Sequence, residues 1–544
     1  MKRLIHIVWP DVALLFILSM TVRLIHINHT PIYDEFYHIL AAQSWLQEGS
    51  MRIAENGSYT RGALFTVIVA GMFKLVGASL VAARIPAVVA GSLWVAALYL
   101  WTRRTAGRTA GWAAALLLCF APGVISSSEV ARFYSLQGLC FLIGAAGFYF
   151  LLQEQGSRRA KFGVGAAAVM AFGAALHLQI NTAIGLAGVA LWIAVKVVFA
   201  VRQRTARRAA FVAVFVAVVC IAVLAASRSE SLDRLLAASR WVALWNAGDS
   251  NNFRYYHYWF LDQYPTLWTL FPLAALIGLA RQPAPAFFSV CVFGVSLILH
   301  SLAAAKEGRY LLYSIPFFFA LWGIGIAQVL PAIRDQISTI VQQTLWTKPR
   351  RPVAISLSAA LLAGALGFII AANPAFPLTY RMLSAGDAGW PRPGYRGHPD
   401  WAAAADALKP LAAAADVVVA SVSVKSLYYL GRCDVELRAD NLFFGGFVAP
   451  EFTIDPRTGR PVISAPESLG RMMQRYPTGL VVMERADWRA PFAVPAAAAD
   501  YLAAHANPVS LPETWGLVAY SWHRPKEAEV TQASDRSPPV SMED

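Results

Sequence analysis

The chain has 544 residues, of which 57% are hydrophobic and only 14% are charged, and its mean hydropathy is +0.49. Soluble domains carry about a quarter charged residues, so this composition excludes an ordinary soluble protein. The formal net charge of +14 is typical of Lys and Arg gathered in the cytoplasmic loops of a membrane protein, and we do not take it as a sign of nucleic-acid binding. We therefore predict a polytopic, α-helical membrane protein.

Eleven candidate membrane spans follow from the apolar runs, each about 17–25 residues long. The first run begins with basic residues, as a signal peptide does, but it lacks a small-x-small cleavage site, so we interpret it as an uncleaved span. The predicted spans are residues 8–26, 84–102, 109–125, 135–152, 162–178, 181–200, 210–227, 265–281, 285–302, 310–330 and 353–372.

A further apolar run, residues 63–77, decides the orientation of the chain. It is short, contains Lys74 and is bounded by Arg61 and Gly77. If it does not cross the membrane, every basic cluster falls on one side, which is then the cytoplasmic side. We therefore predict an interfacial helix here, inside a first external loop of residues 27–83, with a cytoplasmic N-terminus.

The character of the chain changes after residue 372. Residues 373–400 are rich in Pro, Gly and Arg, and short strand-like and helix-like patterns then alternate up to residue 524. This alternation predicts a small extracytoplasmic α/β domain over residues 373–524, after a membrane domain over residues 1–372. Residues 525–544 are polar and are predicted to form a disordered tail. Four of the five cysteines fall in apolar runs, so we predict neither a disulfide framework nor a structural metal site.

Two adjacent acids, Asp34 and Glu35, follow the first span in the stretch "YDEFYH". Acids in the first turn of a helix commonly satisfy free amide groups there. Alternatively, a carboxylate in a partly dry cleft with a second carboxylate beside it has a raised pKa and can act as a general base. The residues alone leave both interpretations open.

Several external charges are expected at the same membrane face as the acid pair. Taken singly they are typical of side chains that reach from a helix end to the membrane surface. Taken together, they suit a lipid substrate that carries a phosphate. The acids could supply a general base, and the cations could bind the phosphate, which Arg does through paired hydrogen bonds. The charges are Arg61, Arg84, Glu129, Arg132, Lys306, Glu307 and Arg309. The aromatic stretch 253–264, which contains His257, fits an interfacial belt or a sugar-stacking surface.

Three segments carry a resemblance to a known superfamily: "YDEFYH" in the first external loop, "ARFYSLQGLCFLIG" at the start of the fourth span and "EGRYLLYSIP" at the start of a late one. With an external soluble domain after the spans, this pattern resembles the GT-C membrane glycosyltransferases. The most similar members are the bacterial protein O-mannosyltransferase and aminoarabinose lipid A transferase group. The resemblance covers about residues 1–372. Where the family commonly has Lys-Pro-Pro, this chain has Thr60-Arg61-Gly62.

The resemblance implies inverting transfer of one sugar from a polyprenyl-phosphate donor to a hydroxyl of a lipid, glycan or protein, on the outer face of the bacterial plasma membrane. It implies Asp34 as the general base, with Glu35 orienting the acceptor or sharing that role. The donor phosphate would be bound by Arg61, Arg309 and Lys306, and further substrate contacts would come from Glu129, Arg132, Tyr310 and His257. Members that transfer a single sugar work without a metal, whereas members that transfer oligosaccharides use a divalent cation. We expect no cofactor and leave the cation open.

Two other functions compete with this prediction. A transporter or lipid flippase would place its charged residues near the bilayer midplane, often in repeated halves, whereas the charges singled out here are expected at the outer face. An oligosaccharide ligase would have a similar topology and a larger donor.

Overall fold

The computed structural model describes most of the chain. The residues that it does not describe are 1, 55–56, 154–156, 203–251, 304–305, 346–359, 361–363, 365–366, 369, 386–398, 440–450, 456, 491–492 and 525–544. The predicted span 210–227, much of the predicted span 353–372 and the predicted tail therefore lie outside the described residues.

The chain divides into two compact units. One is formed by residues 1–52 and 59–394, and the other by residues 53–58 and 395–544. A short segment of the first external loop thus belongs to the second unit. The boundary predicted at residue 372 from composition stays a prediction.

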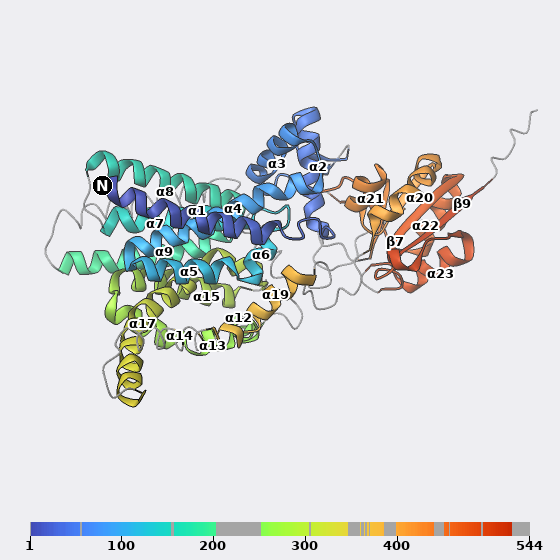
Figure 1. Cartoon of the computed structure of the whole chain (residues 1–544). Coiled ribbons are helices and arrows are strands. Elements are labelled where there is room, and N and C mark those ends of the chain that lie inside the picture. Colours follow the sequence, from blue (N-terminus) through green and yellow to red (C-terminus); the bar gives the residue numbers. More distant parts are fainter. Residues whose placement is uncertain are drawn as a thin grey trace, which may run out of the picture. The chain divides into compact units, whose positions relative to one another are not determined.

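The first unit is a bundle of long helices, many of which run alongside one another (Figure 1). Helix α4 packs against α1, α5 and α7, while α17 packs against α5, α14 and α15. The bounds are α1 Lys2–Leu24, α4 Leu80–Ala106, α5 Arg108–Cys119, α6 Pro122–Ser128, α7 Tyr134–Gln153, α8 Arg158–Leu178, α9 Thr182–Arg202, α12 Tyr255–Gln263, α13 Pro265–Thr269, α14 Phe271–Arg281, α15 Pro283–Leu302, α16 Gly308–Leu311, η1 Leu312–Ser314, α17 Ile315–Leu345 and α19 Ala375–Ala385.

Six helices in the described part of the chain are long and apolar enough to cross a membrane. They correspond to the predicted spans 84–102, 135–152, 162–178, 181–200, 285–302 and 310–330, so the prediction of a polytopic helical protein is confirmed. The total of eleven spans stays a prediction. Helix α1 covers the predicted first span but contains Asp11 and Arg23, and it is not one of the six.

Two predicted spans are broken. The run 109–125 forms α5 and α6, which meet at an angle of 64°. Ala121 there has an extended backbone (φ −72°, ψ 118°), because a residue that precedes a proline, here Pro122, avoids the helical region. The run 265–281 forms the short helices α13 and α14, which meet at Leu270.

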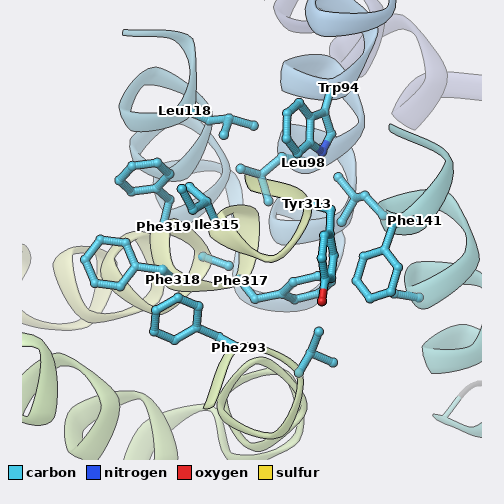
Figure 2. Close-up of a cluster of buried hydrophobic side chains, with 14 of the residues drawn as sticks. Trp94, Leu98, Leu118, Phe141, Phe293, Tyr313, Ile315, Phe317, Phe318 and Phe319 are labelled. Carbon is cyan, nitrogen blue, oxygen red and sulfur yellow. The ribbon is translucent and has the colours of Figure 1, made fainter. Parts of the chain in front are cut away.

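Aromatic side chains fill the middle of the bundle. Figure 2 shows Phe317, Phe318 and Phe319 of α17 close to Phe293 of α15, with Phe141 of α7 nearby. All five are buried, and neighbouring ring centroids lie between 5.3 and 6.2 Å apart. Such offset and edge-to-face pairs add to the stabilisation that comes from excluding lipid and water.

Glycines let the helices approach closely at two contacts. A Cβ on Gly323 of α17 would lie 2.5 Å from the carbonyl oxygen of Ala110 in α5. A Cβ on Gly138 of α7 would lie 2.3 Å from the ring of Trp94 in α4. Small residues at helix contacts are the usual means of association inside a membrane, where packing replaces the hydrophobic effect.

The first external loop contains short elements within the first unit. Helix α2 spans Tyr33–Glu48 and α3 spans Ala63–Val76, and the two pack against each other. With 14 residues, α3 is about 21 Å long, which is shorter than the hydrocarbon core of about 30 Å. Its length fits the predicted interfacial helix.

The second unit contains a seven-stranded sheet, which confirms the predicted α/β domain (Figure 1). The strands lie in the order β5-β6-β4-β3-β7-β9-β8, and the neighbours among β6, β4, β3 and β7 pair in parallel. Parallel neighbours need crossover connections, which helices supply. The bounds are α20 Trp401–Ala414, β3 Val417–Ala420, α21 Ser423–Leu430, β4 Val435–Leu437, β5 Thr453–Ile454, β6 Pro461–Ile463, α22 Pro466–Arg475, β7 Thr478–Glu484, α23 Ala496–His505, β8 Asn507–Val509, η4 Glu513–Trp515 and β9 Leu517–His523.

Candidate active site

The two adjacent acids have different environments because neighbouring residues on a helix point about 100° apart. Glu35 is fully buried, whereas the side chain of Asp34 is 27% exposed. Both lie in the first turn of α2, where the helix dipole favours negative charge. Ile32 caps the helix, and its amide donates to the Glu35 carboxylate at 2.9 Å.

Glu35 forms a buried ion pair with Arg84 of α4. Arg84 donates from Nε and Nη2 to the two carboxylate oxygens at 2.7 and 2.8 Å, and the Ala131 amide donates to Oε2 at 2.7 Å. Arg84 also donates to the carbonyl oxygen of His29 at 2.8 Å. The oxygens of Glu35 are thus occupied by partners within the protein. The pair ties α4 to α2, and the bond to His29 ties α4 to the segment between α1 and α2.

Asp34 lies among guanidinium groups from other parts of the chain. Its Oδ2 is 3.3 Å from Nη2 of Arg132, which precedes α7, and 3.4 Å from Nη1 of Arg309 in α16. Arg61, which lies just before α3, also acts electrostatically on this carboxylate. Residues far apart in the sequence therefore converge on one partly exposed acid.

The electrostatics of both acids differ from the sequence-based expectation of a raised pKa. Burial raises the pKa of Asp34, but Arg132, Arg309 and Arg61 outweigh it and hold that pKa below the ordinary value of 3.8. Burial likewise raises the pKa of Glu35, and Arg84 brings it below 4.5. The expectation was wrong because opposite charges close to a carboxylate outweigh its desolvation. Both carboxylates are ionised at neutral pH.

Aromatic residues line the guanidinium cluster. The charges of Arg132 and Arg309 lie 5.5 and 5.9 Å from the ring centroid of Tyr134, and Arg309 lies 5.6 Å from that of Tyr310. Arg132 also donates to the hydroxyl groups of Tyr59 and Tyr134 at 3.3 and 3.4 Å. These contacts help to hold the cations in place. Arg309 is also paired with Glu307, whose carboxylate lies 2.6 Å from Nε, so part of its charge is already balanced.

His38 lies one helical turn after Asp34 and is buried. Its Nδ1 is 2.9 Å from the Thr66 hydroxyl, and its ring meets those of Tyr59, Phe65 and Phe133 edge to face. Burial is the main reason that its pKa lies well below 6.5. His38 is thus a neutral imidazole beside Asp34.

The structure brings only part of the predicted site together. Asp34, Arg61, Arg132, Arg309 and Tyr310 form one cluster, and their predicted roles in binding and catalysis stay predictions. Sequence reasoning did not single out Tyr59, Tyr134 or His38, although Tyr134 belongs to the "RFY" segment and His38 to "YDEFYH". Their positions relative to Asp34 depend on helix packing, which no local pattern shows.

The other predicted residues have different surroundings. Lys306 is buried and donates to the carbonyl oxygen of Ala303 at 2.6 Å. Glu129 is buried, and the charges of Arg23 and Arg84 act on it electrostatically. His257 accepts a hydrogen bond from Trp268 at 3.0 Å and lines a surface pocket of about 460 Å³, whose lining includes none of the Asp34 cluster.

In the described part of the chain, no three His, Cys, Asp or Glu side chains are grouped so that they could hold a metal ion. The expectation that no cofactor is needed stays a prediction.

This chain is similar to known proteins in structure but not detectably in sequence. No family model matches the sequence, and no curated protein sequence matches it. Among solved structures, ArnT from Cupriavidus metallidurans bound to undecaprenyl phosphate is similar over 96% of this chain and 98% of its own, with a TM-score of 0.61 and 15% identity. The apo state of ArnT gives the same values.

A second similar structure is archaeal. It is the oligosaccharyltransferase AglB from Archaeoglobus fulgidus in complex with an inhibitory peptide and a dolichol-phosphate. The similarity covers 88% of this chain and 69% of AglB, with a TM-score of 0.53 and 12% identity.

The chain has the GT-C fold. This confirms the predicted fold. The match to ArnT includes almost the whole chain, so the GT-C likeness also extends beyond the predicted 1–372.

Proposed function

We propose that this GT-C protein is a membrane glycosyltransferase that moves a single sugar from a polyprenyl-phosphate donor to an acceptor hydroxyl. The observation that carries the proposal is the Asp34 cluster, in which one partly exposed carboxylate meets the guanidinium groups of Arg132 and Arg309 within a GT-C fold. Two of the solved structures similar to this chain were bound to undecaprenyl phosphate and to a dolichol-phosphate, which supports a lipid phosphate as the ligand of these cations.

The reaction can be written on these side chains. The acceptor oxygen bonds to the anomeric carbon of the sugar, and its proton passes to Asp34. The bond between the anomeric carbon and the phosphate oxygen breaks, and the lipid phosphate leaves with the electron pair. Arg309 and Arg61 would stabilise the developing charge on that phosphate. Attack from the face opposite the phosphate inverts the anomeric centre.

A carboxylate with a low pKa suits this role. It is fully ionised at neutral pH and therefore free to take a proton. An acceptor hydroxyl becomes strongly acidic as its oxygen bonds to the sugar, so a weak base is enough if the proton moves late.

The distances between Asp34 and its cations also support a phosphate ligand. Contacts of 3.3 and 3.4 Å are longer than the 2.7–2.9 Å that is typical of strong charge-assisted bonds. The guanidinium groups are thus held near Asp34 without being saturated by it. A phosphate oxygen that replaced the contact with Arg309 would share this guanidinium with Glu307, whose carboxylate lies 2.6 Å from Nε.

Glu35 takes a different role in this proposal from the one expected of it. Its oxygens are occupied by Arg84 and by the amides of Ala131 and Ile32, so it has no free lone pair directed at an acceptor. We assign it as a positioning residue that fixes the first turn of α2, and with it the backbone of Asp34.

The setting of the reaction follows the predicted topology. We propose that the donor and acceptor meet at the outer face of the bacterial plasma membrane, with the N-terminus in the cytoplasm. The membrane holds the lipid donor beside the site and lowers the entropic barrier to encounter. The acceptor is a lipid, a glycan or a protein.

Replacement of Asp34 by Asn tests the proposal. In membranes supplied with a labelled polyprenyl-phosphate sugar, D34N should lose transfer by about 10²–10⁴-fold, as expected when a general base is removed. The matched control is Glu48→Gln, since Glu48 is exposed at the other end of the same helix. Full transfer by D34N would overturn the assignment of Asp34 as the base.

A further inference from the structure

Arg61, one of the cations that act on Asp34, is held by uncharged partners. Its Nη2 donates to Oε1 of Gln179 at 3.1 Å, and its guanidinium carbon lies 5.7 Å from the ring centroid of Phe133. In the described part of the chain these are its direct side-chain partners. Arg309 differs, because it is paired with the carboxylate of Glu307. An amide oxygen and an aromatic ring orient a guanidinium group without cancelling its charge.

Gln179 is itself fixed at the junction of two membrane helices. It lies between α8 and α9 and is 7% exposed. Its backbone amide donates to the carbonyl oxygen of Ala175 in α8 at 3.0 Å, and its carbonyl oxygen accepts from the amide of Thr182 in α9 at 3.0 Å. The side chain that reaches Arg61 therefore starts from a backbone that is bonded on both sides.

The turn that carries Gln179 is bonded to α7 as well. The hydroxyl of Thr182, which is fully buried, accepts from Nε2 of Gln137 at 3.0 Å. Gln137 lies in the first turn of α7, and its amide donates to the carbonyl oxygen of Phe133 at 2.8 Å. A buried amide and a buried hydroxyl that satisfy each other are costly to separate. The turn is thus attached to the helix that begins just after Arg132.

The ring of Phe133 lies beside both Arg61 and Arg132. Its centroid is 5.7 Å from the guanidinium carbon of Arg61 and 5.2 Å from that of Arg132. Both cations act on the carboxylate of Asp34. The oxygens of one phosphate can accept from two guanidinium groups when the spacing of these groups suits the anion. This spacing is set by the ring on one side and by the bond to Gln179 on the other.

We propose that Gln179 is a positioning residue for the phosphate of the lipid donor. Through its bond to Arg61, and through the attachment of its turn to α7, it fixes Arg61 relative to Arg132 and leaves Arg61 charged. This inference rests on the proposed function and deepens it. An apolar side chain at position 179 would leave the charge but not hold it, whereas a carboxylate would hold Arg61 and balance its charge.

Binding of undecaprenyl phosphate to the detergent-purified, full-length protein tests the role of Gln179, with native mass spectrometry as the measurement. Gln179→Leu should weaken the Kd about tenfold, as the loss of one hydrogen bond to a charged group does. Undecaprenol, which lacks the phosphate, should bind wild type and Q179L equally. Asn181→Leu replaces the other amide of the same turn and should keep the wild-type Kd. Wild-type affinity of Q179L for undecaprenyl phosphate would overturn the proposal.

A double variant separates positioning of Arg61 from a general effect on the fold. If Gln179 acts through Arg61, the variant Arg61→Gln/Gln179→Leu should bind undecaprenyl phosphate as weakly as Arg61→Gln alone, because the bond between the two side chains is already lost. A further loss of about tenfold in the double variant would show that Gln179 acts by another route, and this result would overturn the proposal.

Gln179→Glu separates holding from charge. Hydrogen exchange of the amides in residues 60–66 reports whether the start of α3 is held against the turn. Exchange should be faster in Q179L than in wild type and unchanged in Q179E, whereas both variants should bind undecaprenyl phosphate more weakly. Wild-type exchange in Q179L would contradict the holding role. Wild-type affinity in Q179E would contradict the need for an uncharged partner.

The same measurements distinguish failure of this inference from failure of the proposed function. If wild type binds undecaprenyl phosphate no better than undecaprenol, the proposed phosphate site fails and this inference fails with it. If wild type prefers the phosphate and Q179L has the same preference, the proposed function stands and the assignment of Gln179 alone is wrong.

Discussion

Asp34 and Glu35 have different surroundings although they are adjacent in the sequence. Glu35 meets Arg84 inside the protein, whereas Asp34 meets Arg132 and Arg309 at a partly exposed cluster. A buried ion pair contributes little relative to apolar packing, but removal of one partner leaves the other charge without compensation. The two acids should therefore respond differently to neutralisation.

Glu35→Gln should destabilise the protein by about 3–5 kcal/mol, because Arg84 would keep a buried charge without its partner. The measurement is thermal unfolding of the detergent-purified protein. The double variant Glu35→Gln/Arg84→Gln should recover part of the loss, since neither charge then remains. A wild-type unfolding temperature combined with abolished transfer would instead assign Glu35 to the chemistry.

Glu129 is a second buried acid with an unusual pKa. Burial raises that pKa from 4.5 to about 8, and the charges of Arg23 and Arg84 only partly oppose the increase. In the folded protein Glu129 therefore holds its proton over a pH range in which the unfolded chain has lost it. This proton stabilises the folded state below pH 4.5, and the contribution is lost as the pH rises towards 8.

Glu129→Gln should accordingly raise the unfolding temperature relative to wild type more at pH 8 than at pH 5. Gln is neutral at both values and avoids ionisation in a buried site. Glu48→Gln, at an exposed position, should give the same difference at both pH values. A difference for Glu129→Gln that is independent of pH would show that Glu129 is already ionised in the folded protein.

At the scale of elements, close packing between helices depends on glycines at the positions where two helices touch. Gly138 of α7 faces the fully buried ring of Trp94 in α4, and a Cβ on Gly138 would lie 2.3 Å from that ring. Both residues lie in apolar runs that predict spans correctly. Nothing in either run shows that the two positions meet.

Gly138→Ala should cost about 1–3 kcal/mol of stability, as overpacking of a tight core usually does. Thermal unfolding in detergent measures it. Gly163→Ala in α8 is the control, because a Cβ there meets nothing within 4 Å and alanine favours a helix. Equal unfolding temperatures for the two variants would show that α4 and α7 are less tightly packed at Gly138 than described.

The pattern of apolar residues also did not predict where a span breaks into two helices. The run 109–125 has the length and hydropathy of one span, but Pro122 bends it into α5 and α6. The proline was visible in the sequence. A proline inside a membrane helix is often tolerated, so its presence alone did not decide between a straight span and a bent pair.

At the scale of the whole molecule, the fold brings three separate segments to Asp34: the loop before α3, the segment before α7 and helix α16. Arg61, Arg132 and Arg309 come from different parts of the chain and all act on Asp34. The C-terminal unit has its own core on the sheet and includes residues 53–58. A domain boundary taken from composition cannot assign such a short segment to a distant unit, because the segment carries no compositional signal of its own.

The sequence by itself determined the membrane class, six of the predicted spans, the α/β nature of the C-terminal domain and the loop that holds the acid pair. These follow from hydropathy and local periodicity, which depend on near neighbours in the chain. The tertiary structure decided which acid is buried with Arg84, which cations reach Asp34, and that both pKa values fall rather than rise. Those outcomes depend on charges brought from distant positions, and the electrostatic energy of a carboxylate is set by its distance to such charges, not by its place in the sequence.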